Sequence, residues 1–224
     1  MKDLWDLQDQ PESAPRLALS LTRIVKSAIE IADCDGIEAV SMQRIAADLG
    51  FTKMSLYRHV SSKAELLGVM IDTAVGEPPD LSLVAGGWKA RLEELVRQLS
   101  EVWQQHPWVP AVTMGARTMG PREAGWTESA VAALAGTGLT DDERLAAAFI
   151  IFGHVRNTQS MTTTGTQAWS ADGELAQRIH GRANLFPELN QALSGPTPAL
   201  DDNARRFGLD RILDGLATLI KQRS

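Results

Sequence analysis

The 224-residue sequence contains one cysteine, Cys34, and one tyrosine, Tyr57. A single cysteine excludes an intramolecular disulfide and a cysteine-based metal cluster. No run approaches the roughly 20 apolar residues that a membrane-spanning helix requires. The polar first 15 residues lack the basic start and apolar core of a secretory signal. We therefore expect a cytoplasmic protein, and a hydrophobic content of 44% is enough for a substantial core.

The net charge of −6 conceals a local excess of positive charge. Residues 43–63 contain four basic side chains and a single acidic one. How charge is distributed decides what a surface attracts more than the sum does. A basic face on an acidic protein is compatible with a sequence-selective DNA binder that avoids indiscriminate binding.

Apolar residues recur at spacings of three and four through most of the chain, which is typical of amphipathic helices. We find no convincing strand and no internal repeat, so the expected fold class is all-α. Residues 164–203 are broken by glycines and prolines and show no readable pattern. The expected helices span about residues 19–35, 42–49, 53–59, 63–75, 88–106, 109–119, 123–135, 145–161 and 203–221.

Three of the short N-terminal helices have clear starting signals. Ser41 and Thr52 are suitable N-caps, and Ser62 followed by Glu65 has the spacing of a capping box. Gly36 and Gly50 follow two of the helices, where glycine commonly ends a helix. The Gly-Glu-Pro-Pro stretch from Gly76 closes this group, so we expect a domain boundary there.

Residues 42–59 match the helix-turn-helix pattern, two short helices joined by a turn that contains glycine. A recognition helix enters a major groove about 12 Å wide, which favours short exposed side chains at its start. Thr52, Lys53 and Ser55 are such residues. The alternative is that these side chains only form the solvated faces of small helices, but their coincidence with well-marked caps favours a DNA contact.

The surrounding residues suit contacts to the phosphate backbone. Tyr57 and His59 can hydrogen-bond phosphate oxygens, and Lys63 combines a positive charge with the free amides of a helix start. Arg44 is a second phosphate clamp on the preceding helix. Leu56 and Val60 are expected to point into the domain. Arg58 could either contact DNA or lie over the outer edge of the helix without touching it.

The segment "IVKSAIEIADCDGIEAVSMQRIAADLGFTKMSLYRHVSSKAELLGVMID" resembles the DNA-binding domain of the tetracycline-repressor (TetR) family of bacterial transcriptional regulators. The resemblance covers roughly residues 20–73. It implies that Tyr57, His59 and Lys63 match phosphate contacts, while Gln43, Lys53 and Ser55 match base-facing positions. Met54 and Arg58 stand where the family's namesake has proline and tryptophan, so the operator sequence does not carry over.

The resemblance also implies a domain plan and partners. From its polar composition, the segment 1–15 is expected to be a mobile tail before the DNA-binding domain (16–76). By the resemblance, residues 77–224 form a helical domain that binds a small-molecule effector and forms a homodimer. The expected DNA partner is a palindromic operator, because a dimer doubles the contacts of one recognition helix. The apolar helix over 145–155 and the stripe on the last helix are candidate dimer elements that could pair with their symmetry mates as a four-helix bundle, with interior core of a monomer as the alternative for both. The stripe on the last helix consists of Leu209, Ile212, Leu213, Leu216, Leu219 and Ile220.

Ligand-site candidates are large or polar side chains within apolar helices. Each also has an ordinary structural reading: the tryptophans and methionines as core, His154 as a satisfied histidine, and Arg156 as a contact across a dimer. We expect no cofactor, and no residue set has metal-ligand spacing. The candidates are Trp103, Trp108, Met114, Trp126, Phe152, His154, Arg156 and Met161.

The predicted function is a ligand-responsive repressor, with a transcriptional activator or a ligand-independent regulator on the same fold as alternatives. An enzyme built around His154 and Arg156 is a further class. The sequence offers no nucleophile motif, phosphate loop or metal set for it, and such an enzyme leaves the 51–67 cluster unexplained. We therefore predict no catalytic activity.

Overall fold

The computed structural model describes residues 18–114, 117–162, 173–194 and 200–223, with the side chains of 160–162 and 200–204 excluded. Every regular element in these ranges is helical, which confirms the all-α prediction. The chain forms two compact units, the first unit (residues 1–134) and the second unit (residues 135–224). The predicted tail, 1–15, lies outside the described residues. The predicted domain boundary after residue 76 falls inside the first unit and stays a prediction.

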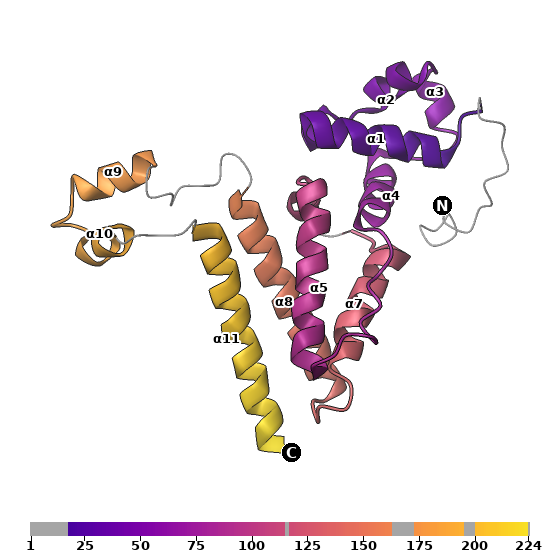
Figure 1. The fold of residues 1–224 in the computed structure, drawn as a ribbon. Coiled ribbons are helices and arrows are strands. Elements are labelled where there is room, and N and C mark those ends of the chain that lie inside the picture. The colour runs from indigo at the N-terminus through magenta and orange to yellow at the C-terminus, as the bar shows by residue number, and fades with distance from the viewer. Residues whose placement is uncertain (1–17, 115–116, 163–172, 195–199, 224) are drawn as a thin grey trace. The chain divides into compact units, whose positions relative to one another are not determined.

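Four α-helices and a 3-10 turn build the N-terminal part of the first unit (Figure 1). Their apolar faces are closed to solvent: Ile24, Ile45, Leu56, Leu66 and Ile71 are each no more than 1% exposed. Ser20, Ser41, Thr52 and Ser62 cap the four helices through their side chains. The elements are α1 (Leu21–Asp35), η1 (Ile37–Ala39), α2 (Met42–Leu49), α3 (Lys53–Leu56) and α4 (Lys63–Val75).

Three further helices complete the first unit: α5 (Gly87–Gln105), α6 (Val109–Val112) and α7 (Pro121–Ala133). The prediction of one helix over 109–119 was wrong, because α6 ends after a single turn. The hydroxyl of Thr113 bonds the Pro110 carbonyl at 3.0 Å at that end. Gly120 is extended (φ −81°, ψ 171°), as the residue before Pro121 tends to be, so a helix cannot run through it.

Helix α4 is fastened to the start of α7. The fully buried Asp72 of α4 accepts hydrogen bonds from the backbone N–H groups of Arg122 (2.9 Å) and Glu123 (3.0 Å). It thereby acts as the N-cap that Gly120, lacking a side chain, cannot supply. At the end of α4, the indole N–H of Trp126 donates to the carbonyls of Val75 (3.2 Å) and Gly76 (3.4 Å). These bonds hold the C-terminal end of α4 in a defined place.

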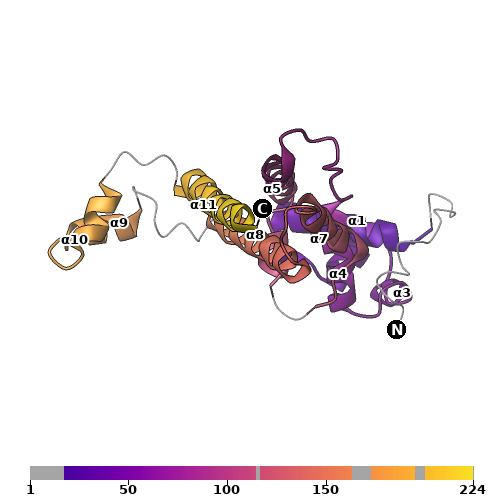
Figure 2. The same cartoon turned by 90° about the horizontal axis from the view of Figure 1, so that it is seen from below.

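The second unit is built on two long antiparallel helices, α8 (Asp141–Thr162) and α11 (Leu200–Arg223), which lie side by side in Figures 1 and 2. Near one end Glu143 pairs with Arg223, and further along His154 Nε2 bonds the Arg205 carbonyl at 2.8 Å. Gly208 is required here, because a Cβ at that position would lie 2.2 Å from the His154 ring.

Part of the apolar surface of α8 is open to solvent in the single chain. Leu145, Phe149 and Ile150 of α8 are 42%, 55% and 57% exposed, and Phe207 of α11 is 63% exposed. The second unit thus presents an apolar stripe along α8 to solvent. Such a stripe is unusual for a surface that stays uncovered.

Two short helices that the sequence pattern did not reveal lie between α8 and α11 in the chain: α9 (Glu174–His180) and α10 (Pro187–Leu193). They pack through a small apolar cluster of their own, made of Ala176, Ile179, Leu189 and Leu193. Within the described residues, no helix has the length and apolarity that a membrane crossing requires.

Candidate functional site

The turn between α2 and α3 depends on Gly50. Its backbone lies in the left-handed region (φ 73°, ψ 28°), which favours glycine. The N–H groups of Gly50 and Phe51 bond the Ala47 and Ala46 carbonyls at 3.2 and 2.8 Å, which closes the end of α2. The chain therefore reverses within three residues and presents α3 across α2, as a helix-turn-helix requires.

Helix α3 is anchored by its inner side. Leu56 and Val60 are 0% and 1% exposed, which confirms that they point into the domain. The helix is one turn long, so the predicted extent to His59 was wrong. Beyond Leu56 the chain continues as turns, in which the N–H groups of Arg58 and His59 bond the carbonyls three residues earlier, and it is extended by Ser62 (φ −153°, ψ 163°), which caps α4. Ser62 Oγ accepts from the Glu65 N–H at 3.1 Å, as predicted.

The other half of the predicted capping box differs from expectation. The Glu65 carboxylate accepts from the backbone N–H of Ser61 at 2.8 Å, and also from the Ser61 hydroxyl, rather than from the N–H of Ser62. The acceptor of this bond is Glu65, as in a capping box, but the donor is the residue before the N-cap. The start of α4 is therefore held by two serines, with Lys63 as its first residue.

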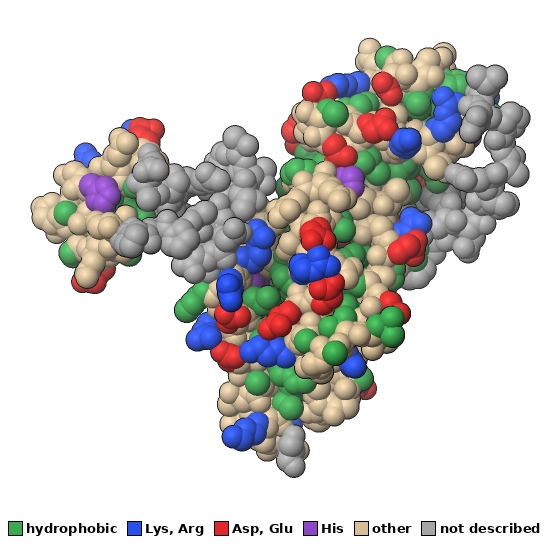
Figure 3. All heavy atoms as spheres, in the orientation of Figure 1, with side chains coloured by type: hydrophobic (Ala, Val, Ile, Leu, Met, Phe, Trp, Pro, Cys, Tyr) green, Lys and Arg blue, Asp and Glu red, His purple; other side chains and the backbone are tan. Residues whose placement is uncertain are grey.

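The residues predicted to touch DNA come together around α2, α3 and the start of α4. Ser55 and His59 are half-buried and the others are exposed. On the face drawn in Figure 3, acidic side chains lie among the basic ones over the N-terminal helices, so the positive charge is local. The predicted set is Gln43, Arg44, Thr52, Lys53, Ser55, Tyr57, Arg58, His59 and Lys63.

Several of these side chains already have partners. Arg44 forms an ion pair with Asp35 at the end of α1. Thr52 Oγ1 lies 2.9 Å from Ser55 Oγ and accepts from the Ser55 N–H at 3.3 Å. The Lys53 ammonium lies 5.8 Å from the centre of the Tyr57 ring, within cation–π range. The two hydroxyls are thus engaged in the cap of α3, while Gln43, Arg58 and Lys63 extend into solvent.

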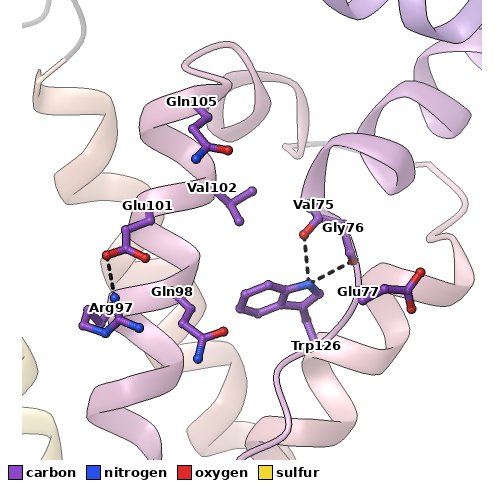
Figure 4. A pocket seen from close by; sticks show the side chains of 9 residues that line it. All are labelled: Val75, Gly76, Glu77, Arg97, Gln98, Glu101, Val102, Gln105 and Trp126. Atoms are coloured by element: carbon purple, nitrogen blue, oxygen red, sulfur yellow. Dashed lines mark hydrogen bonds and ion pairs between the residues drawn. The ribbon is translucent and has the colours of Figure 1, made fainter.

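A second candidate site lies in the first unit, where a cavity of about 390 Å³ opens between the end of α4, α5 and α7 (Figure 4). The indole of Trp126 points from α7 toward α5, and Gln98 and Val102 project toward it. The wall combines apolar surface with amide and charged groups, as small-molecule sites do. It consists of Val75, Gly76, Glu77, Arg97, Gln98, Glu101, Val102, Gln105 and Trp126.

The charged side of this cavity is an ion-pair cluster on α5. Arg97 pairs with Glu94 (2.6 Å) and Glu101 (2.5 Å). Hydrogen bonds from Arg97 and then Gln98 lower the pKa of Glu94 to about 2. Bonding to Glu94 in turn raises the pKa of the Arg97 guanidinium above its ordinary value. Glu94 and Arg97 therefore both stay ionised at neutral pH.

Two family models match the chain. One, described as "Bacterial regulatory proteins, tetR family", covers residues 24–70, and the other, "Tetracyclin repressor-like, C-terminal domain", covers residues 79–220. The chain belongs to the TetR family. It is therefore a regulator with the family's helix-turn-helix DNA-binding domain, and it is not an enzyme.

Relatives of this TetR-family chain include a protein named HTH-type transcriptional repressor DrrR1 from Streptomyces coeruleorubidus. It is 35% identical over 98% of this chain and 85% of the relative. Among solved structures, apo ActR from Streptomyces coelicolor superimposes with a TM-score of 0.74 at 27% identity, covering 92% of this chain and 99% of ActR. ActR in complex with actinorhodin superimposes with a TM-score of 0.73 at 26% identity, covering 89% and 95%.

The ligand candidates predicted from the sequence are scattered in this TetR-family structure. Of them, Trp126 lies in the cavity wall. Trp103 and Trp108 are buried, whereas Met114 is 69% exposed. Phe152, His154 and Arg156 lie half-buried on α8, and the side chain of Met161 lies outside the described residues.

The cavity residues that the sequence reasoning missed are chiefly polar. Arg97, Gln98, Glu101 and Gln105 belong to the hydrophilic side of α5, which periodicity alone assigns to solvent.

The buried atoms Ser100 Oγ and Trp103 Nε1 have no hydrogen-bond partner among the described residues. No group of three His, Cys, Asp or Glu side chains in the described ranges is arranged to hold a metal ion.

Proposed function

We propose that this TetR-family chain is a dimeric repressor that binds a palindromic operator and releases it when a small molecule binds. The observation that carries the DNA part is the geometry of α2 and α3. Leu56 and Val60 fix α3 from inside, while Lys53, Tyr57 and Lys63 remain exposed on the outer side. A protein surface of this kind suits base contacts flanked by phosphate contacts.

The proposal of a dimer is supported by the apolar stripe on α8. Leu145, Phe149 and Ile150 lie at spacings of one to four residues on one side of a helix that already packs against α11 on another. A second copy that covers this stripe and the exposed Phe207 removes apolar area from water. Two-fold pairing of helix pairs produces a four-helix bundle. The stripe on α11 contributes less, because Leu213 is fully buried and the other five predicted residues are half-buried.

The proposal of ligand response is supported by the place of the cavity. Its wall includes Val75 and Gly76, the end of α4, and Trp126, which hydrogen-bonds both of their carbonyls. A ligand that moves the indole therefore acts on the helix whose other end carries Lys63. A small shift there changes the separation of two recognition helices that must span about 34 Å on DNA. ActR, a relative, was crystallised with actinorhodin.

The experiment that tests this proposal is selection of bound fragments from random duplex DNA with the purified protein, followed by titration of the selected sequence. We expect a palindrome with half-sites about one helical turn apart. Tyr57→Ala and Lys63→Ala should weaken binding to all sequences, and Lys63→Ala should reduce the salt dependence of affinity by about one counterion. Lys221→Ala, which removes the same charge from the end of α11, is the matched control.

Expression of the neighbouring genes in a deletion strain then separates repression from activation. Raised transcription supports a repressor, and lowered transcription indicates an activator. If the purified protein selects no sequence, the DNA-binding part of the proposal is wrong.

A further inference from the structure

We propose that Met54 reads a thymine in each operator half-site through an apolar contact with the thymine 5-methyl group. This inference rests on the proposed function, because it assigns a sequence preference to the same DNA-binding surface. It does not depend on the ligand or on the direction of regulation.

The first observation is the direction of the Met54 side chain. Successive residues of an α-helix are rotated by about 100°, so Met54 is turned roughly 200° from Leu56. Leu56 is completely buried against the domain. Met54 therefore lies on the side of α3 that faces away from the domain, and 72% of it is exposed. In a helix-turn-helix that side faces the floor of the major groove.

The second observation is the chemistry of its neighbours. Thr52 and Ser55 bond one another at 2.9 Å and share the cap of α3, so each hydroxyl already has a partner. The Lys53 ammonium lies over the Tyr57 ring. Met54 is therefore the large apolar side chain on the exposed side of α3, and the polar residues next to it already have partners within the protein.

An apolar side chain at this place can recognise only one feature of a base edge. The major groove displays hydrogen-bond donors and acceptors on every base pair, and the thymine methyl is its apolar group. Methionine is long, unbranched and flexible, so it adapts to such a methyl without a fixed fit. A polar base edge opposite Met54 loses hydration and receives no hydrogen bond in return. The expected preference is therefore for thymine.

The test uses the operator obtained by selection, in which each thymine is replaced singly by deoxyuridine. This change removes only the methyl group and preserves base pairing. For the wild-type protein, one thymine in each half-site should be sensitive, with a loss of roughly fourfold in affinity per half-site, since a buried methyl-sized group contributes on this scale. Met54→Ala should bind the thymine operator about as weakly as the wild type binds the uracil operator, and should not distinguish the two.

Two further variants sharpen the result. Met54→Leu, which stays apolar, should retain part of the discrimination. Leu83→Ala removes a side chain that is 88% exposed in the loop before α5 and should leave discrimination unchanged. Affinities are measured by fluorescence anisotropy at one fixed salt concentration, because salt alone changes them strongly.

The inference is overturned if the wild type is indifferent to every uracil, if the selected half-site lacks thymine, or if Met54→Ala discriminates as the wild type does. Each of these outcomes leaves DNA binding itself intact. Failure to select any DNA sequence is a different result, which overturns the proposed function and this inference together.

Discussion

Trp108 donates its indole N–H to a carboxylate oxygen of Asp33 at 2.7 Å, and this bond joins the end of α1 to the start of α6. The Nδ1 atom of His106 lies 2.9 Å from the same oxygen and 3.0 Å from the other one. Because an ionised carboxylate only accepts hydrogen bonds, Nδ1 must carry the proton. Residues about 75 positions apart thus hold the DNA-binding helices against the α5–α6 turn.

We expect Asp33→Ala to lower the free energy of unfolding by about 1–3 kcal/mol, because it leaves the N–H of the buried Trp108 without its acceptor. Urea denaturation followed by circular dichroism measures the loss. Glu30→Ala, which removes an exposed carboxylate from the same helix, is the control and should stay within about 0.5 kcal/mol of the wild type. Equal effects of the two changes would contradict the assignment. In a Trp108→Phe background, Asp33→Ala should cost less.

Gly120→Ala should destabilise the protein by more than about 1 kcal/mol, because the new Cβ would lie 2.1 Å from Asp72 Oδ1. Displacement of Asp72 removes the acceptor for the first N–H groups of α7. Thermal unfolding checks this, with Glu128→Ala on the exposed side of α7 as the control. If the mechanism is right, Asp72→Ala costs less in the Gly120→Ala background than in the wild type. Additive effects would argue against it.

The ion pair between Glu143 and Arg223 predicts that the stability of the fold falls as the pH is lowered. Hydrogen bonds from Arg223, then from the Thr140 backbone, lower the pKa of Glu143 from 4.5 to about 2. The unfolded chain therefore takes up this proton first as the pH falls. The stabilisation is fully present above about pH 4.5 and is lost between there and about pH 2.

We expect Arg223→Ala to lower the urea midpoint of unfolding at pH 6, with a difference from the wild type that shrinks as the pH approaches 2. Lys221→Ala removes the same charge two residues away on α11 and should show no such trend. A difference that is independent of pH would show that Arg223 acts through packing instead.

Arg44 forms an ion pair with Asp35, so removing the Asp35 charge is predicted to raise the affinity for DNA. Asp35→Asn should strengthen DNA binding by roughly two- to tenfold, since it frees the guanidinium for a phosphate and removes a nearby negative charge. The salt dependence should steepen by about one counterion. Asp35→Asn combined with Arg44→Ala should lose this gain. An unchanged affinity in the single variant would show that Arg44 does not reach the DNA.

The sequence predicted the parts of this protein that depend on neighbouring residues. Ser41, Thr52 and Ser62 cap their helices as expected, and Gly50 closes α2, because a cap needs only side chains and amides three residues apart. Leu56 and Val60 are buried as the apolar spacing indicated. The helix-turn-helix is encoded almost entirely at this range, which is why its residues identify the family.

Tertiary structure decided what distant residues do together. The cavity wall takes Trp126 from α7, Gln98 from α5 and Val75 from α4, and no spacing in the sequence relates these positions. Asp72 serves as the cap of a helix 50 residues away, and α6 ends after one turn where a longer helix was predicted. The sequence alone thus determined the capped helices and the surface that we propose faces DNA. The fold determined which polar groups became buried partners and which apolar ones, such as Met54 and Phe149, stayed exposed, because burial depends on contacts between elements that local patterns do not specify.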